Sequence, residues 1–162
     1  MTLHMNLLVV LAFLAVPVVA QEPVKGVANP EALFTDKDAR LNTNKQAALH
    51  IMKDLLQCNH WDEADKWLTE RYLQHNPLIG DGLSALKAGL AALAQQGAVI
   101  RYDKVHRVLG EGNFVLTVSE GTLGGAPTAY YDLFRIEKGR IAEHWDVIEA
   151  IPPRESWAHD NG

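Results

Sequence analysis

The sequence contains a single cysteine, Cys58, so no disulfide can form within the chain. This excludes the small secreted scaffolds that disulfides hold together. Cys58 follows Leu55 and Leu56 in an amphipathic segment, and no base or basic residue pattern accompanies it. A nucleophilic cysteine needs such a setting. We therefore expect a buried thiol that serves only in packing.

Blocks of positive charge are also missing. Lys and Arg total 15 against 20 Asp and Glu, and the formal net charge is −5. A protein that holds nucleic acid presents clustered Lys and Arg to the phosphate backbone, so nucleic acid is not expected as a partner. There are no internal repeats or low-complexity segments. With 162 residues, 48% of them hydrophobic, the chain suits one domain with a substantial core.

Several catalytic signatures are absent as well. The chain has no Gly-x-Ser-x-Gly motif for a serine nucleophile. Its glycine-rich stretches, "LGEGN" and "LGGAP", join expected strands and open no helix, which excludes the usual phosphate-binding loops. No His-x-x-x-His or cysteine-rich spacing indicates a metal site. We therefore expect neither a metal nor a cofactor.

A strongly apolar run opens the chain and extends from Leu7 to Ala15. Pro17 and the small residues ending at Ala20 follow it, which is the pattern of a secretory signal cleaved after Ala20. The run is too short for a comfortable membrane span. We expect an exported protein, periplasmic or secreted, with no membrane association after cleavage. An uncleaved anchor is the alternative, because the flank before the run holds only His4 and no Lys or Arg.

The remaining chain divides into helical and alternating patterns. We expect a linker over 21–41, a domain over 42–153 and a tail over 154–162. Helical spacing predicts three helices, at 42–58, 61–68 and 83–97. Period-2 alternation then predicts four strands at 99–109, 113–122, 128–137 and 140–151. Helices followed by an antiparallel meander indicate an α+β fold, with the helices covering one face of a curved sheet.

The "EKG" turn between the last two strands sets their register. A three-residue loop with Gly139 in the left-handed position places Asp132 opposite His144 and Tyr130 opposite Asp146, all on one face. A two-residue "KG" loop would shift the register and send Asp132 to the other face. We favour the three-residue loop.

The opposite face is too apolar to be left in water. An exposed apolar patch of this kind usually marks an interface, so we expect a homodimer through the sheet. The residues of this face are Tyr131, Leu133, Trp145 and Val147.

The first face carries two carboxylates and an imidazole, and it is the candidate site. In a poorly solvated hollow, Asp132 and Asp146 would favour different protonation states, one acting as a base and one holding a proton. His144 lies close enough to orient or accept a proton from them. The alternatives are ordinary structural roles, namely salt-bridged carboxylates and a core histidine, or a metal site formed by His75, His144 and an aspartate.

Residues from the helical half would complete the hollow. In "YLQHNP", His75 and Asn76 precede Pro77, where they can cap a turn or point into the mouth of the hollow. Aromatic walls would come from Trp61, Trp67, Tyr72 and Phe134, although each can also be ordinary core.

Two stretches, "YLQHNPLIGDG" and "YYDLFRIEKGRIAEHWDVIE", resemble the SnoaL-like branch of the nuclear-transport-factor-2-like superfamily. The resemblance covers about residues 44–153. It implies a cone-shaped α+β domain whose curved sheet wraps a deep pocket, often dimeric. In the polyketide cyclases of that branch an aspartate in the final strand acts as acid and base without a cofactor, and Asp146 matches it by position. Those cyclases have a histidine where this chain has Asp132.

The residues and the resemblance together predict a cofactor-independent lyase, cyclase or isomerase acting on a small hydrophobic carbonyl or hydroxy compound. Asp146 would move the proton, with His144 or Asp132 tuning it, and His75 or Tyr130 would hydrogen-bond the developing oxyanion. Tyr72, Asn76, Trp61 and Phe134 would contact the substrate. A non-catalytic module of the same fold, binding a small ligand or another protein, is the alternative.

Overall fold

The computed structural model describes residues 27–159, so the expected signal peptide and its cleavage site lie outside the described residues. Along the described chain, no helix is both long and apolar enough to cross a membrane. The main elements are α1 (Ala39–His50), α2 (Ala64–Trp67), β1 (Leu68–Gln74), α3 (Gly82–Gln95), β2 (Ile100–Glu111), β3 (Phe114–Leu123), β4 (Ala126–Glu137) and β5 (Arg140–Ala150). Short 3₁₀ turns occupy Pro30–Phe34, Trp61–Glu63 and Arg154–Ser156. The α+β prediction with three helices is confirmed.

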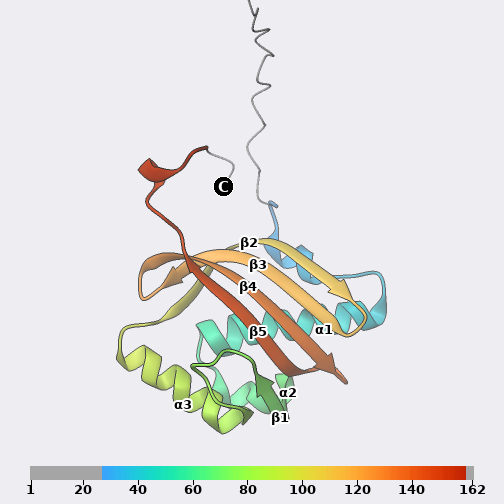
Figure 1. The fold of residues 1–162 in the computed structure, drawn as a ribbon. Helices are drawn as coiled ribbons and strands as arrows, with labels where there is room; N and C mark the ends of the chain where they lie inside the picture. The colour runs from blue at the N-terminus through green and yellow to red at the C-terminus, as the bar shows by residue number, and fades with distance from the viewer. Residues whose placement is uncertain (1–26, 160–162) are drawn as a thin grey trace, which may run out of the picture.

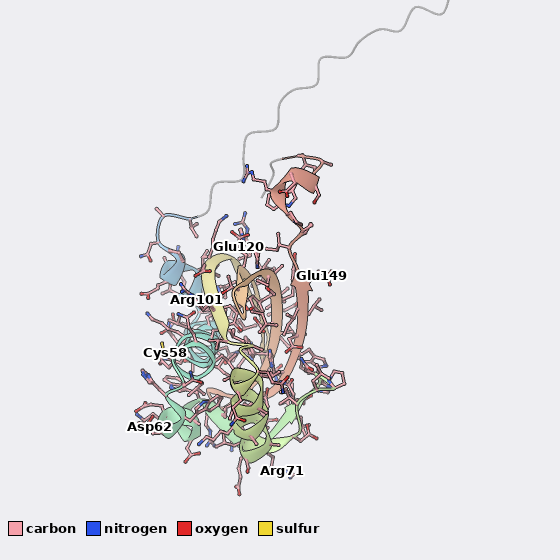
Figure 2. The ribbon with its side chains drawn as sticks, turned by 90° about the vertical axis from the view of Figure 1, so that its left-hand side faces the viewer. Cys58, Asp62, Arg71, Arg101, Glu120 and Glu149 are labelled. Carbon is pink, nitrogen blue, oxygen red and sulfur yellow. The ribbon has the colours of Figure 1, made fainter. Side chains whose placement is uncertain are left out.

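The first helix begins earlier than the sequence pattern indicated. Asp38 caps it, because one carboxylate oxygen accepts hydrogen bonds from the backbone N–H groups of Arg40 and Leu41. The helix continues without a break into a π-helical segment, Ile51–Gln57. Cys58 ends this segment and is exposed at the surface, as Figure 2 shows, so the expected buried thiol is wrong. The next residue, Asn59, has a φ of 59° and turns the chain away.

Part of the expected linker belongs to the domain. Phe34 ends the 3₁₀ turn Pro30–Phe34 with only 2% of its surface exposed, packed into the core. Lys45 of α1 fixes the following residues through a 2.9 Å ion pair with Asp36. The prolines and glycine of the segment suggested an unstructured linker, whereas one buried aromatic side chain is sufficient to anchor it.

The sheet has five strands in the order β1-β5-β4-β3-β2, and not the predicted four. β2 to β5 form the expected antiparallel meander, and β1 adds to its edge parallel to β5. The sequence of β1, "LTERYLQ", was missed because three consecutive polar residues interrupt its alternation and the helical pattern of "WDEADKWL" runs into it.

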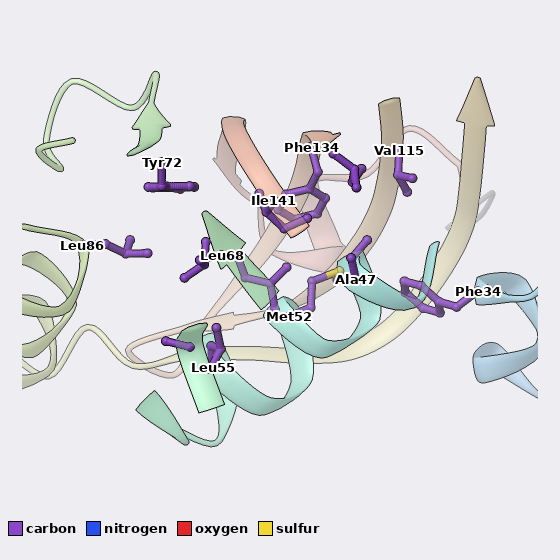
Figure 3. Packing of buried hydrophobic residues seen from close by; sticks show 14 of the residues in the cluster. Phe34, Ala47, Met52, Leu55, Leu68, Tyr72, Leu86, Val115, Phe134 and Ile141 are labelled. Carbon is purple, nitrogen blue, oxygen red and sulfur yellow. The ribbon is translucent and has the colours of Figure 1, made fainter. Parts of the chain in front are cut away.

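All three helices lie on the same side of the curved sheet, which Figure 1 shows for α1 and α3. The hydrophobic core fills the space between α1 with its π-helical extension and the inner faces of β3, β4 and β5 (Figure 3). Its side chains include Phe34, Met52, Leu55, Leu68, Val115, Phe134 and Ile141. α3 packs mainly beside β1 and buries only Leu86 completely.

The β4–β5 turn differs from the prediction. Glu137 pairs with Arg140, so the loop has two residues, Lys138 and Gly139, whose φ values of 50° and 78° match a type I′ turn. Such a turn alone would send Asp132 to the outer face. A bulge at Ala142 prevents this, because Ile136 pairs with Ile141 while Arg135 pairs with Glu143.

The bulge changes the directly opposed pairs but keeps the predicted faces. Asp132 opposes Asp146, and Phe134 opposes His144, in place of the predicted Asp132–His144 pair. Tyr130 opposes Ile148 and not Asp146. The two carboxylates therefore lie across from each other on the inner face, which is a closer arrangement than the sequence analysis predicted.

The outer face matches the prediction in composition. Leu133 pairs with Trp145, and Tyr131 pairs with Val147. Tyr131 is 48% exposed and Val147 61% exposed. The described residues of the chain cover this apolar patch only in part, because Tyr131 also lines a cavity with the C-terminal segment 151–159.

Candidate functional site

A narrow cavity lies between α3 and the inner faces of β1, β5 and β4. One end is polar, and the other is closed by aliphatic side chains from the helices and loops. The polar and aromatic lining residues are Tyr72, Gln74, Asn76, Tyr102, Tyr130, Asp132, His144 and Asp146, and the apolar ones are Ile51, Leu56, Ile79, Leu86, Leu90, Leu93, Ile100 and Ile148. The free space is only about 40 Å³, enough for a few water molecules. The side chains themselves nearly fill the cavity.

His144 is buried, and both of its ring nitrogens have partners. Nε2 lies 3.1 Å from Oδ1 of Asp132, and Nδ1 lies 3.2 Å from Nε2 of Gln74. Phe134 stacks on the ring at a centroid distance of 4.7 Å. The imidazole is therefore held on two edges and one face.

Asp132 is 2% exposed and receives several donors besides His144. The hydroxyl of Thr117, from β3, lies 3.5 Å from its second oxygen. Burial raises the pKa of Tyr102 well above its ordinary value, with further contributions from the charge of Asp132 and a hydrogen bond to it. Neither Thr117 nor Tyr102 was predicted, although the alternation of β2 and β3 would have placed both on the inner face.

Asp146 is held by an amide. Nδ2 of Asn76 lies 2.9 Å from one oxygen of the Asp146 carboxylate and 3.1 Å from the other. Unlike Asp132, Asp146 is only partly buried. A carboxylate that is oriented by one donor and still accessible from a cavity is suited to accepting a proton.

The tyrosine hydroxyls of the cavity differ in their partners. Tyr130 donates to the backbone oxygen of Thr122 at 2.7 Å, and burial raises its pKa to about 12. The hydroxyl of Tyr72 is buried and has no hydrogen-bond partner among the described residues. Burial, followed by the charges of Asp146 and Asp132, raises the pKa of Tyr72 far above its ordinary value. A buried donor without an acceptor is costly, so this hydroxyl is available to hydrogen-bond a water or a ligand oxygen in the cavity.

His75 does not lie in the cavity, and its predicted position at the mouth of the hollow is wrong. Its ring stacks on Trp145 of the outer face at 4.1 Å, and its Nε2 lies 3.0 Å from Oε2 of Glu143. That hydrogen bond, followed by those from Arg135, lowers the pKa of Glu143. The reason is the strand that sequence analysis missed: along β1, Tyr72 and Gln74 point inward, so His75 points outward.

Three aromatic residues predicted as cavity walls lie elsewhere. Phe134 is fully buried behind His144, and Trp61 packs at the edge of the hydrophobic core. Trp67 also packs against the core and stacks on His50 at a centroid distance of 3.8 Å. Of the predicted substrate contacts, Tyr72, Asn76 and Tyr130 line the cavity. Gln74, which sequence analysis missed together with β1, also lines it.

The described residues include no group of three or more His, Cys, Asp or Glu side chains that could hold a metal ion. The set considered from the sequence, His75 with His144 and an aspartate, cannot converge because the two imidazoles lie on opposite faces of the sheet.

A larger cavity, of about 540 Å³, lies on the outer face of the sheet beneath the C-terminal segment 151–159. Its size suits a small ligand better than that of the inner cavity. Its charged lining residues are already paired, because Glu120 lies 3.3 Å from both Lys104 and His106, so it offers fewer free polar groups for catalysis than the inner cavity does. The inner cavity combines two carboxylates, an imidazole and an unpartnered hydroxyl, so we take it as the candidate active site.

Comparisons with known proteins agree with this architecture. A family model for the SnoaL-like domain matches residues 52–144. A candidate polyketide cyclase from Bacillus cereus is 16% identical, with a TM-score of 0.58 over 79% of this chain and 86% of its own. A SnoaL-like candidate polyketide cyclase from Jannaschia is 14% identical, with a TM-score of 0.56 over 71% and 91%.

A candidate ketosteroid isomerase from Kribbella flavida is 18% identical, with a TM-score of 0.52 over 72% of this chain and 88% of its own. No curated protein matches the chain. At these identities the structural likeness establishes the fold, and the family model establishes the relationship over more than half of the sequence. The chain belongs to the SnoaL-like domain family.

Proposed function

We propose that the protein is a cofactor-independent acid/base enzyme, a lyase, cyclase or isomerase of the aldol or retro-aldol type. One observation carries the proposal: the Asp146 carboxylate, oriented by Asn76, shares a cavity with the buried, unpartnered hydroxyl of Tyr72. A base and a hydrogen-bond donor on one cavity are the two groups that proton removal next to a carbonyl requires.

The lining indicates a neutral substrate. The described residues around the cavity include two carboxylates and no Lys or Arg, so an anionic ligand would meet repulsion and no counter-charge. The aliphatic end, formed by residues such as Leu86 and Leu90, favours an apolar body. A small hydrophobic carbonyl or hydroxy compound meets both conditions.

The reaction assigns one role to each group. Asp146 takes the proton from the carbon next to the carbonyl, the C–H electron pair forms the enolate, and the negative charge develops on the carbonyl oxygen. Tyr72 donates a hydrogen bond to that oxygen, and its raised pKa keeps the hydroxyl protonated at neutral pH. In an isomerisation, Asp146 returns the proton to another carbon of the enolate. In an aldol cyclisation, the enolate carbon first attacks a second carbonyl of the substrate, and Asp146 returns the proton to the alkoxide that forms. Tyr72 thus takes the role that sequence analysis gave to His75 or Tyr130.

The structural neighbours support this class of chemistry by analogy. The candidate cyclase of Bacillus cereus and the candidate ketosteroid isomerase of Kribbella flavida carry names of reactions that pass through enolates. Fold alone does not assign an activity, so the argument depends on Asp146 and Tyr72.

Proton exchange tests the proposal without knowledge of the natural substrate. The protein is incubated in D₂O with a panel of small neutral ketones and β-hydroxy ketones, and proton NMR follows loss of the signals next to the carbonyl. We expect Tyr72→Phe to slow exchange by about 10²-fold, because one oxyanion donor is lost. Its free energy of unfolding should not fall, because the substitution removes an unsatisfied buried hydroxyl.

Tyr130→Phe is the matched control, since its hydroxyl is already bound to Thr122. Equal exchange rates in wild type and Tyr72→Phe would remove Tyr72 from the mechanism. No catalysed exchange with any ketone, together with saturable binding of the same compounds, would favour the non-catalytic module. The free volume of about 40 Å³ favours a module that binds another protein, because a ketone can enter the cavity only if lining side chains move.

We also propose a homodimer formed through the outer face of the sheet, since Tyr131 and Val147 are large, apolar and about half exposed there. Val147→Glu should convert the dimer to monomer, because a carboxylate in an apolar interface loses its hydration. Light scattering after size-exclusion chromatography measures the mass. Val99→Glu, an equally apolar exposed residue away from this face, should leave it unchanged. A monomeric wild type would contradict the proposal.

A further inference from the structure

We propose that Gln74 is a positioning residue that keeps His144 neutral, with its single ring proton on Nε2. The proposal is based on three contacts. The Gln74 amide contacts the backbone of Asn76 with its oxygen and Nδ1 of His144 with its nitrogen, and Nε2 of His144 contacts Asp132. Together they determine where the proton of His144 lies, and they leave Asp146 as the group that exchanges protons with a ligand.

The orientation of the Gln74 amide follows from a backbone contact. Oε1 of Gln74 lies 3.3 Å from the backbone nitrogen of Asn76, which is always a donor, so this end of the amide must be the oxygen. The other end, Nε2, is then the donor that lies 3.2 Å from Nδ1 of His144. If the amide were reversed, its NH₂ group would face the backbone N–H of Asn76, and two donors would meet with no acceptor between them.

The state of His144 follows from the orientation of that amide. Nδ1 must accept from the Gln74 amide, so it carries no proton, and the neutral ring has its proton on Nε2. Nε2 lies 3.1 Å from Oδ1 of Asp132 and donates to it. The carboxylate of Asp132 would by itself favour a doubly protonated imidazole, and the Gln74 amide opposes this by occupying Nδ1.

The same kind of anchoring orients the neighbouring amide. Oδ1 of Asn76 accepts from the backbone N–H of Leu78 at 2.9 Å, which turns its NH₂ group toward Asp146. The short motif "QHN" therefore presents two fixed amide donors to the cavity, one to an imidazole and one to a carboxylate. His75, between them, points to the outer face.

The role of His144 changes as a result. Both of its nitrogens are occupied by protein groups, so it does not take a proton from a ligand or give one. It acts through Asp132, which also receives the Thr117 hydroxyl and whose charge raises the pKa of the buried Tyr102. Tyr72, Tyr130 and Asp146 are the remaining titratable groups that line the same cavity.

Long-range proton–nitrogen NMR of the full ¹⁵N-labelled protein at pH 7 tests the proposal directly. His144→Gln identifies the signals of this residue by their loss. In the wild type we expect one ring proton on His144, at Nε2, and an unprotonated Nδ1. A proton on Nδ1, or on both nitrogens, would overturn the proposal. Sequential assignment through the wild-type backbone resonances identifies the same His144 signals, so this measurement decides the matter even if no variant folds.

Gln74→Glu tests the part played by Gln74 itself. A glutamate of the same shape still accepts from the Asn76 N–H but accepts at Nδ1 instead of donating. We expect His144 to carry protons on both nitrogens in this variant at pH 7. Gln95→Glu, an exposed change of equal charge on α3, should leave the wild-type pattern. A His144 that stays singly protonated in Gln74→Glu would show that Gln74 does not control it.

The protonation state of His144 does not depend on the reaction, whereas its effect on rate rests on the proposed function. If proton exchange is catalysed, Gln74→Glu should change its pH profile while Gln95→Glu does not. If no exchange is catalysed, the proposed function is wrong, whereas the NMR result still decides whether Gln74 controls the protonation of His144.

Discussion

Asp146→Asn is expected to lower catalysed proton exchange from neutral ketones by about 10²- to 10⁴-fold, the usual contribution of a general base. The asparagine has almost the same shape but cannot accept the proton at neutral pH. In the wild type, the Asn76 amide contacts both carboxylate oxygens of Asp146. The asparagine side chain of the variant keeps one of these oxygens as an acceptor, so the local fold should survive. The exchange assay in D₂O measures the rate, and a thermal melt checks the fold.

Glu149→Gln is the matched control for that substitution. Glu149 lies on the same strand, β5, but is exposed at the surface (Figure 2), and the change removes an equal charge. We expect it to retain the full rate. A fully active Asp146→Asn protein would exclude Asp146 as the base, and Asp132 could not simply replace it, because Asp132 is buried and in contact with the His144 ring and the Thr117 hydroxyl.

The sequence predicted the face of the sheet correctly, although for incomplete reasons. Alternation placed Asp132, His144 and Asp146 together, and the structure confirms that they line one cavity. The predicted turn had three residues, whereas the real turn has two. A bulge at Ala142 compensates for the difference and returns Asp132 to the same face as His144 and Asp146. A bulge of this kind leaves no strong mark in a sequence, because Ala142 is apolar and suits either position.

The errors around β1 have a single physical origin. Its polar residues Glu70 and Arg71 are tolerated because β1 is an edge strand, and they concealed its alternation. Without β1, the inward position of Gln74 and the outward position of His75 could not be assigned. The sequence also could not predict that the Tyr72 hydroxyl has no partner among the described residues, because this depends on which other side chains reach the cavity.

The second large effect is structural, and it lies at the far edge of the sheet. A Cβ atom at Gly121 of β3 would lie 1.9 Å from the backbone oxygen of Arg101 and 2.9 Å from the backbone nitrogen of Asp103. Neither atom belongs to a flexible side chain, so the β2 backbone would have to move. The pairing of β2 and β3 is already irregular between Tyr102 and Lys104. We expect Gly121→Ala to cost roughly 3 to 5 kcal/mol of unfolding free energy.

Gly110→Ala in β2 is the control that distinguishes this steric clash from any general cost of placing alanine in the sheet. Its Cβ would meet the end of the flexible Lys45 side chain at 3.2 Å, so urea denaturation should show a change below about 1 kcal/mol. Equal midpoints for the two variants would mean that β2 can shift freely. Thr117, which donates to Asp132, and Tyr102, which lines the same cavity, belong to these same two strands. A shift large enough to accommodate alanine at 121 would therefore disturb the donors of Asp132 even in molecules that remain folded.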